Sequence, residues 1–165
     1  MPRNADSEIA VFISHSHRDK NIAEALVNFL IAGVGLEPDD IRCTSHSPTG
    51  LAIGSLIANR LRDAIENCDY FLPLITPNTL SSEFVAFEIG AAWALETSLA
   101  PLVLESATTK IPALLQGLVY CDLKSLDALI QLVSELSQEL FYAQDRRSPN
   151  QMLSAARTFL AATAV

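Results

Sequence analysis

The sequence predicts an α/β protein in which helices cover both faces of a doubly wound parallel sheet. Short apolar runs rich in β-branched residues alternate along the chain with longer segments whose apolar residues recur at helical spacing. Such an alternation is typical of right-handed βαβ units, which build parallel sheets. A length of 165 residues and a hydrophobic content of 50% fit one globular domain with a sizeable core.

The first strand and the first helix are predicted near the N-terminus. Residues 9–13 form a continuous apolar run, too short for a helix and typical of a strand buried on both faces. Ser16 and Asp19 have capping-box spacing, and Gly33 and Gly35 supply a stop signal. The segment between these signals is apolar at i, i+3, i+4, i+7 and i+8: Ile22, Ala25, Leu26, Phe29 and Leu30.

The second strand and the second helix follow, and then the third strand. Residues 41–44 predict a short strand, and residues 45–54, with one proline and two glycines, predict a loop. The helix after it has the apolar face Ile57, Leu61, Ala64, Ile65 and Cys68. Residues 70–76 have the composition of a strand, but proline donates no ladder hydrogen bond, so Pro73 predicts an irregularity there.

The second half of the chain continues the alternation. The predicted elements are a helix at 83–95, a strand at 101–104, a short strand at 119–121 and a helix at 125–140. A connector then leads to a terminal helix at 151–164, which either packs on this domain or belongs to a partner.

Charge and cysteine content exclude several function classes. Eleven basic residues against nineteen acidic ones give a net charge of -8 without a basic stripe, so nucleic acid is not expected as a partner. Three widely spaced cysteines, Cys43, Cys68 and Cys121, suggest neither a disulfide framework nor a zinc knuckle. No signal-peptide core or membrane-length apolar stretch is found, so a cytoplasmic location without membrane insertion is expected. The low charged fraction of 18% favours self-association.

Ligands of such sheets bind at the carboxyl ends of the strands, which directs attention to residues 14–19, 45–54 and 78–88. Standard nucleotide fingerprints are absent, because the pair Gly50 and Gly54 lacks the lysine of a phosphate-binding loop. For Ser16 and Asp19, helix capping is favoured over catalysis or metal binding. Cys43 and His46 could supply two metal ligands, but no second pair of residues has zinc-like spacing, so no metal is expected.

Glu88 is unusual because it lies on an apolar helix, one turn after Phe84. A carboxylate among apolar side chains should be paired or should line a cleft. The alternatives are a half-buried glutamate with satisfied hydrogen bonds and one that faces solvent beside the stripe.

Three motifs in this order resemble a TIR domain, and the bacterial type more than an animal receptor. Val11-Phe12-Ile13-Ser14-His15-Ser16-x-x-Asp19 resembles the opening strand and loop of the family, and Gly50 to Gly54 falls where its BB loop lies. Ser82-x-Phe84-x-x-x-Glu88 resembles its Ser-x-Trp-x-x-x-Glu motif, with Phe84 in place of the common tryptophan. The resemblance covers residues 9–140, with 1–8 as an N-terminal extension and 141–165 as a connector and C-terminal helix.

The resemblance implies a flavodoxin-like fold with five parallel strands in the order 2-1-3-4-5. It also implies NAD+ hydrolysis at the nicotinamide–ribose bond, with NAD+ as substrate and no separate cofactor. Glu88 is then the catalytic residue, and the substrate-binding residues are Ser14, His15, Ser16, Ser45 and Phe84. Backbone N–H groups at the start of the first helix, with Arg18, Lys20 or Arg42, are the candidate donors to the diphosphate.

Members of this family commonly complete their site when neighbouring domains stack, so self-association is implied here through the loop with Pro48, Gly50 and Gly54. The resemblance also implies a role in bacterial immunity against phage and a fused or separate sensor. Two alternatives remain: a TIR adaptor without catalysis, and an enzyme similar to nucleoside deoxyribosyltransferases. A receiver-type phosphorylation domain is disfavoured, because its acidic pair, phosphoacceptor aspartate and lysine are missing.

Overall fold

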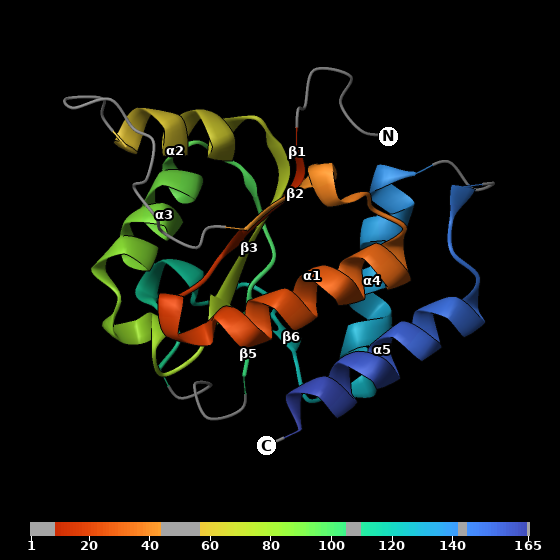
Figure 1. Cartoon of the computed structure of the whole chain (residues 1–165). Helices are drawn as coiled ribbons and strands as arrows, with labels where there is room; N and C mark the ends of the chain where they lie inside the picture. The colour runs from red at the N-terminus through yellow and green to blue at the C-terminus, as the bar shows by residue number, and fades with distance from the viewer. Residues whose placement is uncertain (1–8, 44–56, 105–109, 142–144, 165) are drawn as a thin grey trace.

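A parallel sheet with helices on both faces forms the centre of the computed structural model, which describes residues 9–43, 57–104, 110–141 and 145–164 (Figure 1). The strand order is β2-β1-β3-β5-β6, with β4 also paired to β3, and every described pair is parallel. The strands are β1 (Ile9–Ser14), β2 (Ile41–Cys43), β3 (Cys68–Ile75), β4 (Ser98–Leu99), β5 (Leu102–Val103) and β6 (Cys121–Asp122). The predicted doubly wound fold is confirmed, and its strand order is that of flavodoxin-like proteins.

Five α-helices in the described residues cover the two faces of this sheet: α1 (Lys20–Val34), α2 (Ile57–Glu66), α3 (Glu83–Ala94), α4 (Leu126–Leu140) and α5 (Pro149–Thr163). Helices α1, α4 and α5 share one hydrophobic core with the sheet, and α2 and α3 share another on the opposite face (Figure 1). Short 3-10 helices lie at His17–Asp19, Pro38–Asp40, Thr79–Ser81 and Ala113–Leu115. None of the helices in the described ranges has the length and apolar content needed to cross a membrane.

Pro73 explains why the sheet has six strands where five were predicted. The carbonyls of Phe71 and Ile75 accept the N–H groups of Ala100 and Leu104 at 3.1 and 3.0 Å. Pro73 lies midway between Phe71 and Ile75, so its backbone faces the same neighbour but has no N–H to donate. The segment that pairs with β3 at this edge is accordingly split into β4 and β5, which replace the single strand predicted at 101–104.

Two further boundaries differ from the prediction. Pairing of the last strand begins at Cys121, whereas Val119, predicted inside that strand, is 89% exposed. Cys68 was assigned to the apolar face of the second helix, but that helix ends at Glu66 and Cys68 is the first residue of β3. Both shifts are within the usual uncertainty of element ends, which depend on pairing partners distant in sequence.

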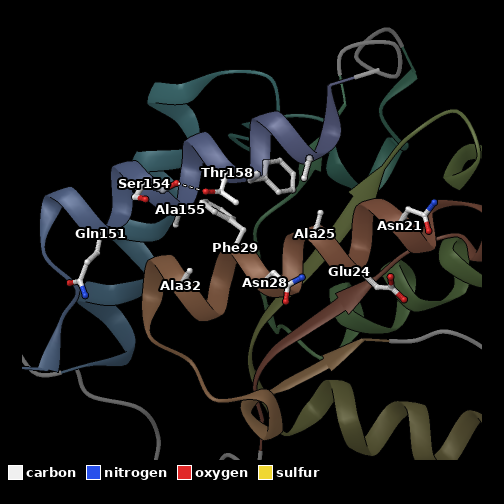
Figure 2. Close-up of a pocket in the computed structure, with 12 residues that line it drawn as sticks. Asn21, Glu24, Ala25, Asn28, Phe29, Ala32, Gln151, Ser154, Ala155 and Thr158 are labelled. Carbon is white, nitrogen blue, oxygen red and sulfur yellow. Dashed lines mark hydrogen bonds between the residues drawn. The ribbon is translucent and has the colours of Figure 1, made fainter.

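The C-terminal helix packs on this domain. Ala155, Ala156 and Phe159 of α5 are buried in the core shared with α1 and α4, and the Phe159 ring lies 5.3 Å from that of Phe29. A groove of about 520 Å³ follows the junction of α1 and α5, with Asn28 and other polar side chains along it (Figure 2). Of the two options left open by the sequence, packing on this domain is therefore the one observed.

Replacing Gly35 with alanine is expected to destabilise the protein by about 1–2 kcal/mol. Gly35 ends α1 with φ of 96°, and its N–H reaches the carbonyls of Leu30 and Ile31. A Cβ would also lie 3.1 Å from the Arg147 side chain. The free energy of unfolding in urea measures the effect.

Gly90→Ala is the matched control for that variant. Gly90 lies inside α3 and a Cβ there meets nothing within 4 Å. The free energy of unfolding of this variant should rise by about 0.5–1 kcal/mol. Equal behaviour of the two variants would contradict the role given to the left-handed cap.

Candidate active site

Buried polar side chains gather where the strand order reverses. The chain leaves β1 toward α1 on one face of the sheet and leaves β3 toward α3 on the other. In sheets of this kind, ligands bind at this point of divergence, at the carboxyl ends of the strands. Within the described ranges, every buried polar or charged side chain except that of Ser137 comes from these segments: Ser14, His15, Ser16, Asp19, Thr76, Thr79 and Glu88. They lie in segments after β1 and β3 where the sequence predicted site residues, and their role in ligand binding stays a prediction.

Glu88 is fully buried at this edge. The Ser82 hydroxyl caps α3 by accepting the Val85 N–H at 3.4 Å, and the helix directs Glu88 toward the sheet. The Ser14 hydroxyl, at the end of β1, donates a hydrogen bond to Glu88 Oε2. With 0% exposure, Glu88 does not face solvent, and the bond to Ser14 offsets part of the cost of burying its carboxylate.

His15 and Cys43 form a second contact beside Ser14. His15 is 2% exposed, and its Nδ1 lies 3.6 Å from the Cys43 sulfur at the end of β2. Burial of the Cys43 thiol and, to a smaller extent, the carboxylates of Glu24 and Glu88 raise its pKa to about 11. Cys43 is therefore a neutral thiol at physiological pH, close enough to Glu88 to respond to its charge.

From the sequence, Cys43 was considered only as a metal ligand together with His46, which lies outside the described residues. The sequence could not show how β2 is aligned with β1. In the structure Ile13 pairs with Cys43, which places the thiol beside the loop after β1. No group of three or more histidine, cysteine, aspartate or glutamate side chains is placed to hold a metal ion within the ranges that the structure describes.

Asp19 connects the segment after β1 with the segment after β3. Its carboxylate accepts hydrogen bonds from Thr76 Oγ1 at 2.6 Å and from Asn78 Nδ2 at 2.7 Å, both in the segment after β3. Thr76 Oγ1 also accepts the N–H groups of Asn78 and Thr79. Asp19 thus holds the start of α1 against the segment that leads into α3.

The predicted side-chain cap at Ser16 and Asp19 is wrong. Neither side chain makes a capping bond, although the Asp19 N–H does reach the Ser16 carbonyl at 2.8 Å. The carboxylate is used instead by Thr76 and Asn78, donors that lie 57 and 59 residues along the chain. Local spacing could not reveal this tertiary use.

The remaining predicted residues are placed as follows. Ser16 is buried, and Phe84 is half-buried against the core between the sheet and α2 and α3, one turn before Glu88. Arg18 and Lys20 are exposed at the start of α1, and Arg42 is exposed on β2. Ser45, Pro48, Gly50 and Gly54 lie outside the described residues. The groove of Figure 2 is lined by none of the predicted site residues.

Replacing Asp19 with alanine is expected to lower the free energy of unfolding by about 1–3 kcal/mol, because buried donors on Thr76 and Asn78 lose their acceptor. Urea unfolding measures the loss. Asp63→Ala, at an exposed position of α2, is the control and should change stability by less than about 0.5 kcal/mol. A loss no greater than the control's would show that the Asp19 bonds contribute nothing to folding.

The fold and this edge define a flavodoxin-like α/β protein with a buried carboxylate at its switch point. A model of the TIR domain family matches residues 11–133. The chain therefore belongs to the TIR domain family, as its motifs predicted.

Individual proteins resemble this chain at low identity or over only part of its length. The chain is 30% identical over 91 residues to the uncharacterized protein YddK of Bacillus subtilis (strain 168), a match of 55% of this chain and 34% of that protein. The chain thus spans about a third of the length of this curated relative.

Two solved structures are similar at low identity. A diflavin flavoprotein A3 from Nostoc sp. has a TM-score of 0.40 at 15% identity, covering 95% of this chain and 91% of that one. A flavodoxin-like domain from Synechococcus sp. has a TM-score of 0.38 at 12% identity, covering 93% and 94%. Because both scores are below 0.5, the assignment of the fold rests on the strand order itself.

Proposed function

We propose that this TIR domain hydrolyses NAD+ at the nicotinamide–ribose bond, with Glu88 as the catalytic residue. The observation that carries the proposal is the fully buried Glu88 carboxylate, held by the Ser14 hydroxyl at the carboxyl end of β1. A carboxylate kept out of water at a ligand-binding edge is costly for folding, and functional sites are where such costs are usually found.

The reaction needs only one carboxylate. Ordinary glycosidases use a second one to protonate a poor leaving group, whereas nicotinamide leaves NAD+ as a neutral molecule because its ring nitrogen is already cationic. As the bond from C1′ to that nitrogen breaks, positive charge develops on the ribose. Water then adds its oxygen to C1′ and releases one proton, which gives ADP-ribose and nicotinamide.

In this proposal the Glu88 carboxylate stabilises the positive charge that develops on the ribose. A fixed negative charge in a site that excludes water stabilises an oxocarbenium-like transition state more than it stabilises the ground state. The hydrogen bond from the Ser14 hydroxyl to Oε2 orients the carboxylate. The neutral Cys43 thiol places no additional charge beside it.

Substrate binding would use the residues around this pair. In this proposal His15 and Ser16 line the floor of the site and the half-buried Phe84 ring is an apolar wall. Ser45, which lies outside the described residues, stays a predicted substrate-binding residue. The diphosphate would be bound by backbone N–H groups at the start of α1 and by the exposed side chains of Arg18 and Lys20.

Activation is proposed to depend on self-association, with the segment that carries Pro48, Gly50 and Gly54 as a contributor. TIR domains commonly self-associate, and a charged fraction of only 18% favours contact between copies. The corresponding biological role is that of a cytoplasmic effector in bacterial immunity against phage, triggered by a fused or separate sensor.

NAD+ consumption by the wild-type protein tests the proposal. The chain is assayed dilute and then concentrated with a crowding agent, and the products are resolved by chromatography. We expect release of nicotinamide with ADP-ribose or a cyclic isomer, at a rate that rises steeply with protein concentration. Transfer of deoxyribose between bases without NAD+ loss would instead identify a deoxyribosyltransferase. No turnover of either substrate under any condition would favour an adaptor.

A further inference from the structure

His15 and Cys43 bring two polar side chains together near the Glu88 carboxylate. His15 follows Ser14, whose hydroxyl donates to Glu88, and Cys43 is the last residue of β2. The Cys43 sulfur lies 3.6 Å from His15 Nδ1, which is hydrogen-bond distance for sulfur because its radius is larger than that of oxygen. His15 is buried, so neighbouring side chains rather than bulk water decide which of its ring nitrogens carries a proton.

Three arrangements of protons are compatible with this contact. The thiol can donate to an unprotonated Nδ1, a protonated Nδ1 can donate to the thiol sulfur, or a thiolate can pair with an imidazolium. Burial, together with the carboxylates of Glu24 and Glu88, raises the pKa of the Cys43 thiol to about 11, which excludes the thiolate at neutral pH. The unprotonated nitrogen of an imidazole is a good acceptor, whereas a thiol sulfur is a weak one. Donation from the thiol to Nδ1 is therefore favoured.

We propose that Cys43 is a positioning residue for His15, and that its S–H group donates a hydrogen bond to Nδ1 and holds the ring neutral with the proton on Nε2. In histidine the hydrogen bond made by one ring nitrogen sets the protonation of the other. Protonation of Nδ1 would require that nitrogen to give up the bond from Cys43. The thiol therefore opposes conversion of His15 to a cation.

The charged groups around His15 favour the cation instead. The carboxylates of Glu24 on α1 and Glu88 on α3 both raise the pKa of the thiol beside His15, so their charge acts at this point of the site. The Asp19 carboxylate is buried in the same segment as His15. The titratable side chains next to His15 and Cys43 in the sequence are exposed to solvent: His17, Arg18, Lys20 and Arg42. Because nearby negative charge favours a protonated imidazole, the neutral ring depends on the bond from the thiol.

The consequence for catalysis rests on the proposed function. A protonated His15, directly after Ser14, would cancel part of the negative charge on Glu88 that stabilises the positive charge developing on the ribose. A neutral ring leaves that charge intact. The thiol should matter most below neutral pH, where an imidazole ordinarily takes up a proton.

Magnetic resonance of the protein with isotope-labelled histidine rings tests the tautomer without NAD+. Proton–nitrogen correlation spectra show which ring nitrogen carries the proton, and His15→Gln identifies the signals of His15 by their loss. We expect the wild type at neutral pH to have a neutral His15 ring with its proton on Nε2. A ring protonated on Nδ1, or on both nitrogens, would overturn the proposal, and this measurement needs no variant of Cys43.

Two substitutions of Cys43 separate its hydrogen bond from its volume. Cys43→Ala removes the donor, so the ratio of protonated to neutral His15 at a given pH should rise about tenfold, which corresponds to one ordinary hydrogen bond. Cys43→Ser keeps a donor of similar size and should restore the wild-type ratio. Cys121→Ala is the matched control, because that half-buried thiol lies on β6 at the opposite edge of the sheet. A ratio in Cys43→Ala equal to that of the wild type would overturn the proposal.

The pH profile of NAD+ hydrolysis tests the consequence for the reaction. In Cys43→Ala about one tenth of the wild-type proton concentration should suffice to halve kcat, whereas Cys43→Ser and Cys121→Ala should follow the wild-type profile. A wild-type profile in an active Cys43→Ala would overturn the inference and leave the proposed function intact. A wild type without hydrolysis would contradict the proposed function, and the spectra would still decide the state of His15.

Discussion

Glutamine in place of Glu88 is expected to abolish NAD+ hydrolysis while the fold remains intact. The substitution removes the negative charge but keeps the shape of the side chain. Loss of a single preorganised electrostatic group costs about 10²–10³ in kcat. Because positive charge develops only as the nicotinamide bond breaks, kcat should fall much more than KM rises. Initial rates of nicotinamide release over a range of NAD+ concentrations separate the two constants.

Stability should change in the opposite direction to activity. An amide is less costly to bury than a carboxylate, and its oxygen still accepts the hydrogen bond from the Ser14 hydroxyl. We therefore expect the thermal midpoint of Glu88→Gln to equal or exceed that of the wild type. Such a trade of stability for function is common where a site holds a charge out of water.

Glu83→Gln is the matched control. Glu83 lies in the first turn of the same helix but is exposed, and its charge interacts with the helix N-terminus, an effect of about 0.3–1 kcal/mol. This variant should hydrolyse NAD+ at the wild-type rate. If Glu88→Gln keeps its activity, or if Glu83→Gln loses as much, Glu88 is not the catalytic residue.

The sequence was sufficient to predict those parts of the site that depend on local pattern. The apolar run at 9–13 predicted a buried strand, and Ser82 with the apolar run after it predicted α3 nearly to its ends. Glu88 was conspicuous because a carboxylate within an apolar helix must be accommodated by the fold. Its partner Ser14 was named from the family resemblance, and the structure adds the hydrogen bond between them.

The parts that were missed depend on contacts between distant segments. The capping spacing of Ser16 and Asp19 was a local signal, but the Asp19 carboxylate is bound by Thr76 and Asn78 of another loop. The approach of Cys43 to His15 follows from the register of β2 on β1, which no single segment encodes. Pro73 did predict an irregularity in β3. Its consequence lies in the segment paired with β3, which forms two short strands, β4 and β5, in place of one.

Replacing Phe12 with alanine is expected to lower the free energy of unfolding by about 3–5 kcal/mol, a large part of the 5–15 kcal/mol typical of a whole domain. Phe12 is fully buried in β1 and stacks on Phe71 of β3, with ring centroids 5.4 Å apart. The truncation leaves a cavity in the core under α2 and α3, which the paired strands prevent from collapsing. Denaturant unfolding measures the loss, and Phe12→Leu should lose far less.

The position of the cavity matters as much as its size. Side chains alternate along a strand, so Phe12 and Ser14 point to the same face of the sheet, the face on which α3 holds Glu88. A cavity there loosens α3 and lengthens the bond between Ser14 and Glu88. Phe12→Ala should therefore lose activity even under conditions where the protein is fully folded.

Phe159→Ala removes an equally large buried ring from α5, on the opposite face of the sheet. Its loss of stability should be similar, but its folded molecules should keep the wild-type rate because the cavity lies away from Glu88. The measurement compares rates per folded molecule at a temperature below both midpoints. If the two variants lose activity equally, general destabilisation explains the effect. If only Phe12→Ala loses it, the packing of α3 on β1 sets the geometry of the carboxylate.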